Sequence, residues 1–464
     1  MIRLLFGLIF WSACWLHGAK PNFLVIVTDD QRPDTIGALD NPRIHTPNLD
    51  WLVKQGQVWE NFVCANPLCV PSRAEILTGC PGYRNGVMGM GGERMDPKLT
   101  LWPAAMVAGG YHAWYTGKWM NDGQPTTRGY QEARALFSSG GGTWKKGQVI
   151  PGRKGRPITG YRNWTFKTSE GKPDLDKGIG LTPLTDRHIA DGALAFLKQK
   201  TDRPFFLHVN FTGPHDPLIY PPGYEKKYTA AHMKLPANFQ PRHTFDHGNL
   251  TGRDERLLPW PRTREDVLEE LAVYYAVVDH IDKQVGRLLD QLRADGRLAN
   301  TYVIFTSDHG LAIGSHGLMG KQNMYDHSIR VPFLVVGPGV AKGKRVPAFG
   351  YLRDLYPTVC ELAGIPIPKT VQAQSLAPVL LGRQHNVHTE VTGYFRDVQR
   401  MLWRGSWKLI YYPKTGRHQL FDLATDPHEL TDLSPLQPHR RRMERMRRSL
   451  NQWFHDQGDP LFLR

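Results

Sequence analysis

The sequence predicts an α/β fold: a large, mostly parallel mixed sheet sandwiched by helices, followed by a smaller C-terminal subdomain with an antiparallel sheet. Two observations predict the main sheet. Continuous apolar β runs end in polar clusters, and segments with helical apolar spacing alternate with these runs. A third observation predicts the subdomain, because after about residue 375 the chain changes to short β runs separated by Gly and Pro turns. With 464 residues and 41% hydrophobic residues, the chain can bury a substantial core.

Three apolar runs define the predicted main sheet, and each is followed by residues that carry chemistry. Strands buried on both faces have continuous apolar sequences, which is typical of parallel strands covered by helices. Open α/β sheets place their sites at the carboxyl edge of such strands, so we expect these polar groups to gather there. The runs and the groups that follow them are residues 22–28 with Asp29 and Asp30, residues 204–211 with His215, and residues 301–307 with Asp308 and His309.

Helices are predicted over residues 186–199 and 264–292, where apolar residues recur at helical spacing. Thr263 can cap the second helix, with Asp266 three residues further on. A third helix is predicted at the C-terminus, where arginines concentrate between residues 440 and 448. We interpret it as a docked helix with a solvated basic face, in preference to a nucleic-acid-binding patch. Its apolar stripe is Met443, Met446, Leu450, Trp453 and Phe454.

The chain divides into three predicted parts. Residues 1–19 have one basic residue, a short apolar stretch and a small-residue end, which is the pattern of a signal peptide. Residues 20–375 form the predicted catalytic domain, and residues 376–464 the C-terminal subdomain with antiparallel sheet and helix. We therefore expect an exported protein, periplasmic or secreted, without an integral membrane anchor, because no other stretch is apolar enough to span a bilayer.

Net charge indicates which classes of molecule the protein could bind, and cysteine content limits how many disulfides it can form. The formal net charge is +15 and the pI about 9.5, which fits a nucleic acid, an anionic surface or a polyanionic substrate. After removal of the leader four cysteines remain, and a fold of this size does not need a disulfide framework. If Cys69 is converted, the other three allow one disulfide at most.

One motif carries most of the functional information. Cys69-Val70-Pro71-Ser72-Arg73, followed by Leu77-Thr78-Gly79, closely resembles the maturation motif of type I sulfatases, in which the cysteine is oxidised to Cα-formylglycine. Alone, a cysteine beside a proline is most often a small buried hydrophobe. The resemblance covers the chain from about Lys20 to its end, including the segment 421–430, and implies the alkaline-phosphatase-like α/β fold. It also implies a formylglycine-generating enzyme as a partner.

Acidic residues at two strand ends predict a metal site. Asp29 and Asp30 are adjacent like charges, which need a cation or raised pKa values; the alternative is a helix cap plus a solvated acid. The resemblance implies that these two, with Asp308, His309 and the formylglycine from Cys69, surround one divalent cation, usually calcium. Three carboxylates suit a hard cation. His309 is the less usual member, because imidazole prefers softer metals.

Four further residues match catalytic positions of the family. Arg73 belongs to the maturation motif and would steady the diol and the cation site. Lys118, in Gly-Lys-Trp, and Lys321 match the lysines that contact sulfate, although single lysines are mostly solvated surface residues. His215, in Gly-Pro-His-Asp-Pro, matches the histidine suited to protonating the departing alcohol oxygen; alone, it would be read as a turn residue.

One position departs from the family pattern, which usually reads Gly-Lys-Trp-His. Met120 stands where that histidine contacts the diol and helps eliminate sulfate. Methionine neither accepts nor donates the proton. We expect either that Asp122, His112 or a water takes over this role, or that sulfate release is slowed.

Three functions compete. The favoured one is a sulfuric ester hydrolase, dependent on formylglycine and a divalent cation, that releases inorganic sulfate from a sulfated carbohydrate. A second is a phosphoester or phosphonate hydrolase of the same superfamily, which the Cys-x-Pro-Ser-Arg motif at Cys69 argues against. A third, motivated only by Met120, is a sulfated-polysaccharide-binding protein that has lost turnover. A nucleic-acid partner is not expected. Substrate choice is expected to depend on loops such as residues 138–163.

Overall fold

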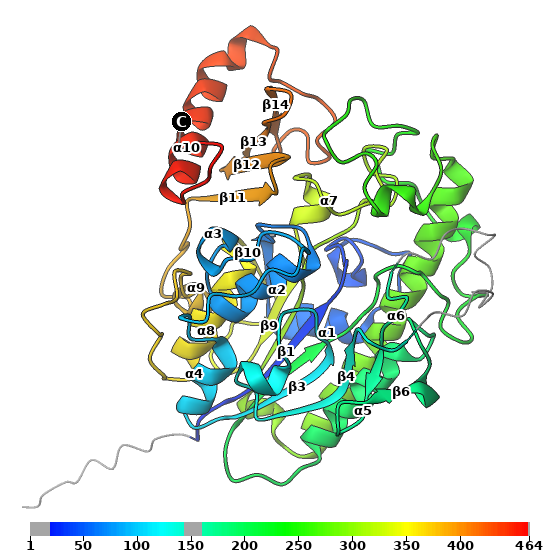
Figure 1. The fold of residues 1–464 in the computed structure, drawn as a ribbon, viewed down its shortest axis with the longest axis vertical. Helices are drawn as coiled ribbons and strands as arrows, with labels where there is room; N and C mark the ends of the chain where they lie inside the picture. The colour runs from blue at the N-terminus through cyan, green and yellow to red at the C-terminus, as the bar shows by residue number, and fades with distance from the viewer. Residues whose placement is uncertain (1–18, 143–159, 463–464) are drawn as a thin grey trace, which may run out of the picture.

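The computed structural model describes residues 19–142 and 160–462. Apart from its last residue, the predicted signal peptide lies outside this range, as does most of the predicted loop 138–163. The described part contains a ten-stranded sheet in the order β10-β2-β9-β8-β1-β7-β3-β4-β5-β6 (Figure 1). Its strands are β1 Asn22–Thr28, β2 Gln57–Val63, β3 His112–Lys118, β4 Glu132–Ser138, β5 Thr165–Lys167, β6 Pro173–Asp174, β7 Phe205–Asn210, β8 Thr301–Ser307, β9 Phe333–Val336 and β10 Lys344–Tyr351.

The centre of the sheet is parallel. β1 pairs in parallel with β8 on one side and β7 on the other, and β3 continues the parallel pairing from β7 to β4. β9 and the small strands β5 and β6 pair antiparallel, so the sheet is mixed. All seven residues of β1 and of β8 are buried, which explains their continuous apolar sequences. The predicted mostly parallel mixed sheet is confirmed.

Helices cover both faces of this sheet, and β1 serves both layers by alternation. Phe23, Val25 and Val27 pack into a core with α2, α4 and α8, whereas Leu24 and Ile26 pack into a core with α1, α5 and α6. The helices are α1 Pro47–Gln55, α2 Cys69–Thr78, α3 Gly82–Asn85, α4 Trp102–Ala108, α5 Thr185–Leu197, α6 Arg264–Ala294, α7 Asp326–Ile329, α8 Leu355–Leu362, α9 Ala377–Leu380 and α10 Arg440–Asp456.

A second sheet follows in the chain and carries α10 on its surface, at the top of Figure 1. Its four antiparallel strands, in chain order, are β11 Glu390–Phe395, β12 Gln399–Arg404, β13 Trp407–Tyr412 and β14 Arg417–Asp422. Met446, Leu450 and Phe454 of α10 are buried in a shared core, while most arginines of the helix are exposed. The predicted antiparallel subdomain sheet is therefore confirmed, and the apolar stripe of the C-terminal helix docks as expected.

The predicted element boundaries shift by a few residues. The helices expected at 186–199 and 264–292 run over Thr185–Leu197 and Arg264–Ala294, and the Thr263 side chain accepts a hydrogen bond from Asp266 N at 3.1 Å, as expected for a cap. All four cysteines of the described chain are free thiols. The domain boundary at residues 375–376 stays a prediction. Among the described helices, none is long and apolar enough to cross a bilayer.

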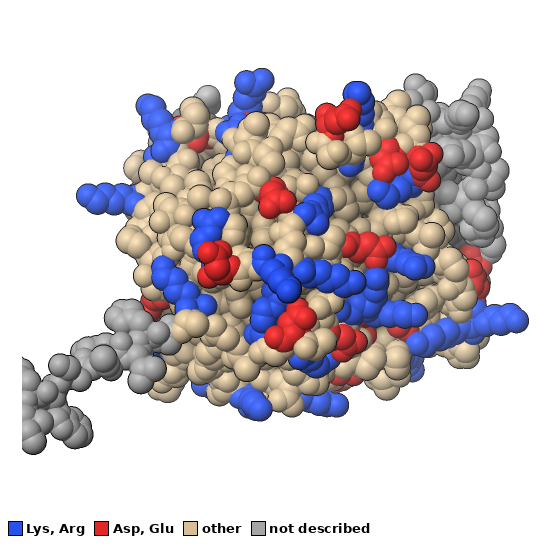
Figure 2. All heavy atoms as spheres, turned by 90° about the horizontal axis from the view of Figure 1, so that it is seen from below, with Lys and Arg blue, Asp and Glu red and all other residues tan. Residues whose placement is uncertain are grey.

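Basic side chains are spread over the surface. Figure 2, which views the molecule from below Figure 1, shows Lys and Arg in excess on that face, with Asp and Glu among them. This distribution agrees with the formal net charge of +15. A dispersed positive field favours anionic molecules in general and does not by itself define a binding site.

Candidate active site

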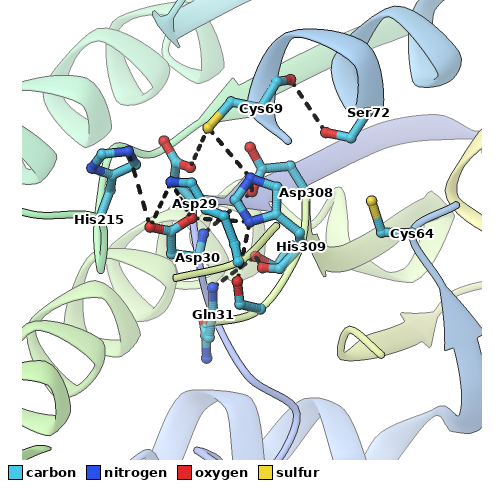
Figure 3. A network of polar contacts seen from close by, with 12 residues as sticks. Asp29, Asp30, Gln31, Cys64, Cys69, Ser72, His215, Asp308 and His309 are labelled. Atoms are coloured by element: carbon cyan, nitrogen blue, oxygen red, sulfur yellow. Dashed lines mark hydrogen bonds and ion pairs between the residues drawn. The ribbon is translucent and has the colours of Figure 1, made fainter. Parts of the chain in front are cut away.

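The carboxyl edge of the parallel strands brings the predicted residues together. β1 ends before Asp29 and Asp30, β8 before Asp308 and His309, and β3 ends on Lys118. β7 leads through a short turn to His215, and α2 begins at Cys69. Figure 3 shows the Cys69 sulfur pointing into the group formed by Asp29, Asp308 and His309, with Cys64 lying apart from it. The expected clustering of polar groups at one sheet edge is thus observed.

Cys69 lies deep in this cluster. Cys69 is the first residue of helix α2, and only 2% of its surface is exposed. The sulfur lies 3.5 Å from Asp29 Oδ1 and 3.3 Å from His309 Nε2. Burial and Asp29 act to raise the pKa of the thiol, but Lys118, Lys321 and His309 outweigh them and lower that pKa to about 6. Position 69 is therefore set in a cationic surrounding that stabilises a negative charge.

Four of the predicted ligands form a compact set of donor atoms. One ligand atom each from Asp29, Asp30, Cys69 and His309 lie within 4.8 Å of one another, and all four residues are buried. Asp30 also has a positive φ of 69°, an uncommon backbone state for a residue with a side chain. Two carboxylates and an imidazole so close together fit a divalent cation.

Asp308 belongs to the same centre but not to that mutual set. Its Oδ1 lies 3.5 Å from His309 Nε2 and accepts a hydrogen bond from Asp30 N at 3.2 Å. Its Oδ2 receives Arg73 Nε at 3.0 Å. Asp308 is therefore in contact with the ligand set, and Arg73 occupies its outer oxygen.

Three buried cations face the carboxylates. Lys118 contacts Asp29 Oδ2, Lys321 Nζ lies 2.9 Å from both oxygens of Asp30, and Arg73 pairs with Asp308. Burial acts to raise the pKa of Asp29, but Lys118 together with His215 and other cations holds that pKa well below its usual range. Every predicted cation therefore reaches the centre.

His215 lies at the mouth of this centre. Its Nδ1 is 2.6 Å from the backbone oxygen of Asp216 and 3.1 Å from Oδ1 of the same residue, while its Nε2 is 4.0 Å from Asp30 Oδ2. Burial and Lys321 act to lower the pKa of His215, but Asp30 and Asp216 outweigh them and raise it. A histidine with a raised pKa at the edge of the centre is suited to donate a proton.

A pocket of about 320 Å³ opens over Cys69. On one side it reaches the reactive centre through Cys69, His215 and Lys321, and on the other it reaches the second sheet through Phe395 and Arg396. Its walls combine aromatic rings with amide and charged groups, a mixture suited to a polar ligand with an apolar face. The remaining lining residues are Leu68, Met90, Met120, Gly160, Tyr161, Trp164, Asn249, Gly252, Arg253, Asp254 and Gln322.

The structure excludes two candidates for the role of the missing histidine. Met120 lines the pocket, as the motif predicts. His112, however, begins β3 at the end opposite Lys118 and contacts Arg203, at 3.0 Å from its Nη2. Asp122 pairs with Arg128 and accepts Met95 N at 3.3 Å. A titratable group that does contact Cys69 is His309, whose Nε2 lies 3.3 Å from the sulfur.

Sequence reasoning missed several residues of the site. Tyr161 donates a hydrogen bond to Asp29 Oδ2 at 2.7 Å, and its ring lies 4.7 Å from that of His215. Asn210 accepts a hydrogen bond from Arg73 Nη1 at 2.6 Å, and Arg253 holds Asp216 at 2.6 Å. Asn210 could have been found as the last residue of a strand. Tyr161, which has a positive φ of 56°, gives no signal in the sequence.

Comparison with known proteins identifies the family. A model for the family described as Sulfatase matches residues 21–365, which is most of the chain. The chain belongs to the sulfatase family. A second model, described as N-sulphoglucosamine sulphohydrolase, C-terminal, matches residues 314–456. The protein is thus a sulfatase, that is, a sulfuric ester hydrolase, with the fold of the alkaline-phosphatase-like superfamily.

Sulfatases from several organisms are similar over nearly the whole chain. An arylsulfatase of Clostridium perfringens is 29% identical over 456 residues, which cover 93% of this chain and 94% of the relative. A choline-sulfatase of Rhizobium meliloti is 28% identical, over 89% of this chain and 82% of the relative.

Solved structures share the fold. A protein solved in complex with its substrate D-glucosamine-2-N,6-O-disulfate superposes with a TM-score of 0.77 at 21% identity, over 95% of this chain and 99% of that one. A phosphonate monoester hydrolase of Agrobacterium radiobacter superposes with a TM-score of 0.76 at 22% identity, over 94% and 96%. At these identities the likeness describes the architecture and leaves the substrate open.

Proposed function

We propose that this sulfatase releases inorganic sulfate from a sulfated carbohydrate and uses a formylglycine made from Cys69 together with one divalent cation, calcium. The observation that carries the proposal is the position of Cys69. It begins α2 inside the maturation motif, and its sulfur lies among carboxylates, an imidazole and two lysines at the carboxyl edge of the sheet. A phosphonate hydrolase shares the fold but has no specific support in these residues.

The modification supplies the nucleophile. As formylglycine, position 69 provides in its hydrated form one hydroxyl for attack on sulfur and a second for expelling sulfate. The residues around it then hold this group. Asp29 and His309 lie next to the side chain at position 69 and fix its orientation, and Ser72 Oγ donates to the Cys69 backbone oxygen at 3.2 Å, which fixes the start of the helix.

The cation would be held by Asp29, Asp30 and His309, with Asp308 beside them. When bound, it supplies a Lewis acid for a sulfate oxygen. Calcium fits the carboxylate-rich donor set better than zinc does, because hard cations prefer oxygen ligands. Arg73 fixes Asp308 from the outer side, so the carboxylate presents one oxygen to the centre.

Lys118 and Lys321 are suited to bind the sulfuryl oxygens, because both are buried beside position 69 and carry fixed positive charge. His215 is suited to protonate the departing alcohol oxygen. It lines the pocket, its Nδ1 is held against Asp216, and its pKa is raised above the usual value. A proton donor of this kind matters most for a sugar alcohol, which is a poor leaving group.

The proposed substrate class rests on the pocket. Trp164, which is partly exposed, supplies a ring on which a sugar can lie, beside the largely buried rings of Tyr161 and Phe395. Asn249 and Gln322, which are hydrogen-bonded to each other at 2.8 Å, supply amide groups at the pocket wall. The proposal also includes export to the periplasm or medium and modification by a formylglycine-generating enzyme, both of which follow from the sequence patterns at residues 1–19 and 69–79.

Two measurements test the proposal. Peptide mass spectrometry of protein expressed with a maturing enzyme should show formylglycine at position 69. Sulfate release should be observed from members of a panel of defined sulfated saccharides. Cys69→Ser, which lacks the second hydroxyl, should fold and turn over almost no substrate. A fully active preparation that contains only unmodified Cys69, or one that hydrolyses phosphonates but no sulfate ester, would contradict the proposal.

A further inference from the structure

Arg396 is a cation in the lining of the pocket over Cys69 that has no part in the catalytic chemistry. Arg396 lies in the turn between β11 and β12 and lines the wall opposite the reactive centre. It comes from the second sheet, about which the maturation motif carries no information. Its backbone has a positive φ of 44°, a state that is uncommon and costly for a residue with a side chain and that clusters at ligand-binding positions.

Among the described residues, Arg396 has no acidic partner at ion-pair distance. The two other cations that line this pocket have acidic partners: Lys321 pairs with Asp30 at 2.9 Å, and Arg253 binds Asp216 at 2.6 Å. Within residues 19–142 and 160–462, the Arg396 guanidinium forms no ion pair. Its carbon lies 5.4 Å from the centroid of the Phe395 ring, and its Nε lies beside Gly89, close to the Glu93 carboxylate but not paired with it. An exposed guanidinium beside a pocket is free to bind an oxyanion.

The turn that carries Arg396 is held firmly to the catalytic centre. Tyr394 N donates to Ala65 O at 2.8 Å, which ties β11 to the segment that leads into α2. Gln399 Oε1 accepts Met324 N at 3.0 Å, which ties β12 to the segment that carries Lys321. The side chain of Arg396 is exposed, but its backbone is therefore fixed relative to both Cys69 and Lys321.

We infer that Arg396 is a specificity residue that binds a second anionic group of the saccharide substrate, while the sulfate ester to be cleaved lies against position 69. The inference rests on the proposed function. The second group is an oxyanion, either another sulfate or a carboxylate, since a guanidinium binds both with two parallel hydrogen bonds. The preferred substrate is accordingly a sugar with two anionic groups.

The test compares kcat/KM for a sulfated neutral hexose, the same hexose with a second sulfate, and a sulfated uronic acid. In Arg396→Gly, the ratio of kcat/KM for doubly to singly charged substrates should fall about tenfold, mainly through KM. Arg396→Lys should keep part of the ratio. The control Lys342→Ala, an exposed lysine before β10 that does not line the pocket, should leave the ratio unchanged.

Arg396→Gly also separates binding from folding. Glycine adopts a positive φ without strain, so the melting temperature should stay constant or rise while selectivity falls. The anion is identified by comparing the two doubly charged substrates: the one whose kcat/KM falls more, disulfate or uronic acid, carries the group that Arg396 binds. An unchanged ratio, or an equal loss for singly and doubly charged sugars, overturns the inference. If the parent enzyme releases sulfate from no substrate, the proposed function itself fails.

Discussion

At the scale of single residues, the active-site edge is a set of matched opposite charges buried in the protein. Asp29, Asp30 and Asp308 each contact a cation, respectively Lys118, Lys321 and Arg73. Burying such charges is costly unless each is paired, so a change at one position affects its partner as well. Substitutions here must therefore be chosen to separate catalysis from folding.

Asp308 illustrates this choice. From the sequence, Asp308→Ala is expected to abolish activity at little cost in stability, but the structure pairs Asp308 with buried Arg73, so removing the carboxylate leaves Arg73 Nε without that acceptor. Asp308→Asn, which keeps an oxygen, should fold, lose calcium affinity and lower kcat/KM about 100-fold or more. Metal analysis and a calcium titration of activity check this. Asp40→Asn, at an exposed surface carboxylate, should change neither.

Met120 gives a second prediction at this scale. Because neither His112 nor Asp122 reaches position 69, expulsion of sulfate should be the slower half-reaction. The parent enzyme should then show a burst of alcohol release, and Met120→His should remove the burst and raise the steady-state rate about tenfold. Rapid-mixing kinetics measure both, with Met120→Leu as the control. No burst in the parent enzyme would indicate that His309, 3.3 Å from Cys69 Sγ, already fills the role.

At the scale of elements, helix α6 packs against the sheet and also caps the N-terminus of helix α1. Its buried residue Asp282 accepts hydrogen bonds from Leu49 N at 2.7 Å and from Asn48 N at 3.1 Å, at the first turn of α1. The Thr46 side chain makes no capping hydrogen bond to the backbone of α1. Asp282, which is far from α1 in the sequence, instead accepts hydrogen bonds from the backbone N–H groups of the first turn of that helix.

We predict that Asp282→Ala destabilises the protein by about 1–3 kcal/mol at neutral pH, because it leaves buried N–H groups without acceptors. Burial raises the pKa of Asp282 to about 6 against its hydrogen bonds from Leu49 and Asn48. The folded state then binds the proton more tightly than the unfolded one, which adds proton-linked stability that is full below about pH 4 and is lost as the pH rises through about 6. The cost of Asp282→Ala should therefore be larger at about pH 4 than at neutral pH, where only the hydrogen-bond contribution remains. Urea unfolding at several pH values measures it. The control Asp290→Ala, at an exposed position of the same helix, should cost less than about 0.5 kcal/mol.

At the scale of the whole molecule, the two sheets depend on each other. The second sheet supplies Phe395 and Arg396 to the pocket, and buried Lys408 of β13 pairs with Asp326 of α7 at 2.6 Å and with Glu429 at 2.5 Å. This ion-pair group joins the C-terminal sheet to the segment that follows Lys321. Loss of these ion pairs should change the position of the pocket residues and lower the free energy of unfolding.

Lys408→Met should therefore destabilise the protein by about 3–5 kcal/mol, since it leaves the buried Glu429 carboxylate without its cation, whereas Asp326 keeps its ion pair with Arg330 at 3.2 Å. Hydrogen exchange should show the largest loss of protection in β11–β14. The double variant Lys408→Met/Glu429→Gln should recover part of the stability. Lys414→Met, at an exposed ion pair of the same sheet, should behave like the parent protein. Equal loss of protection across both sheets would contradict the role as a local link.

The sequence was informative where chemistry and periodicity are local. Asp29, Cys69 and Asp308 stand in short motifs at strand or helix ends, and β1 and β8 are continuous apolar runs, so these features and the parallel sheet are predicted. Tyr161 contacts Asp29, which lies 132 positions earlier in the chain, and Asp282 contacts Leu49, 233 positions earlier. Arg396 reaches the pocket from the second sheet. No local sequence pattern marks any of these three residues. Their roles depend on long-range packing, which one sequence does not display.

The burial of α2 has a consequence for the timing of biosynthesis. Apart from Val70, every residue from Cys69 to Thr78 is buried, and Cys69 itself is 2% exposed. In the proposed maturation, an oxidising enzyme has to reach the Cys69 side chain, which is buried once α2 packs against the sheet, so oxidation should precede that packing. Folding and modification then compete. The fraction of molecules that become modified equals the rate of modification divided by the sum of the rates of modification and folding. Conditions that slow folding relative to oxidation should raise that fraction, and on the proposed function a molecule that folds first should stay unmodified and inactive.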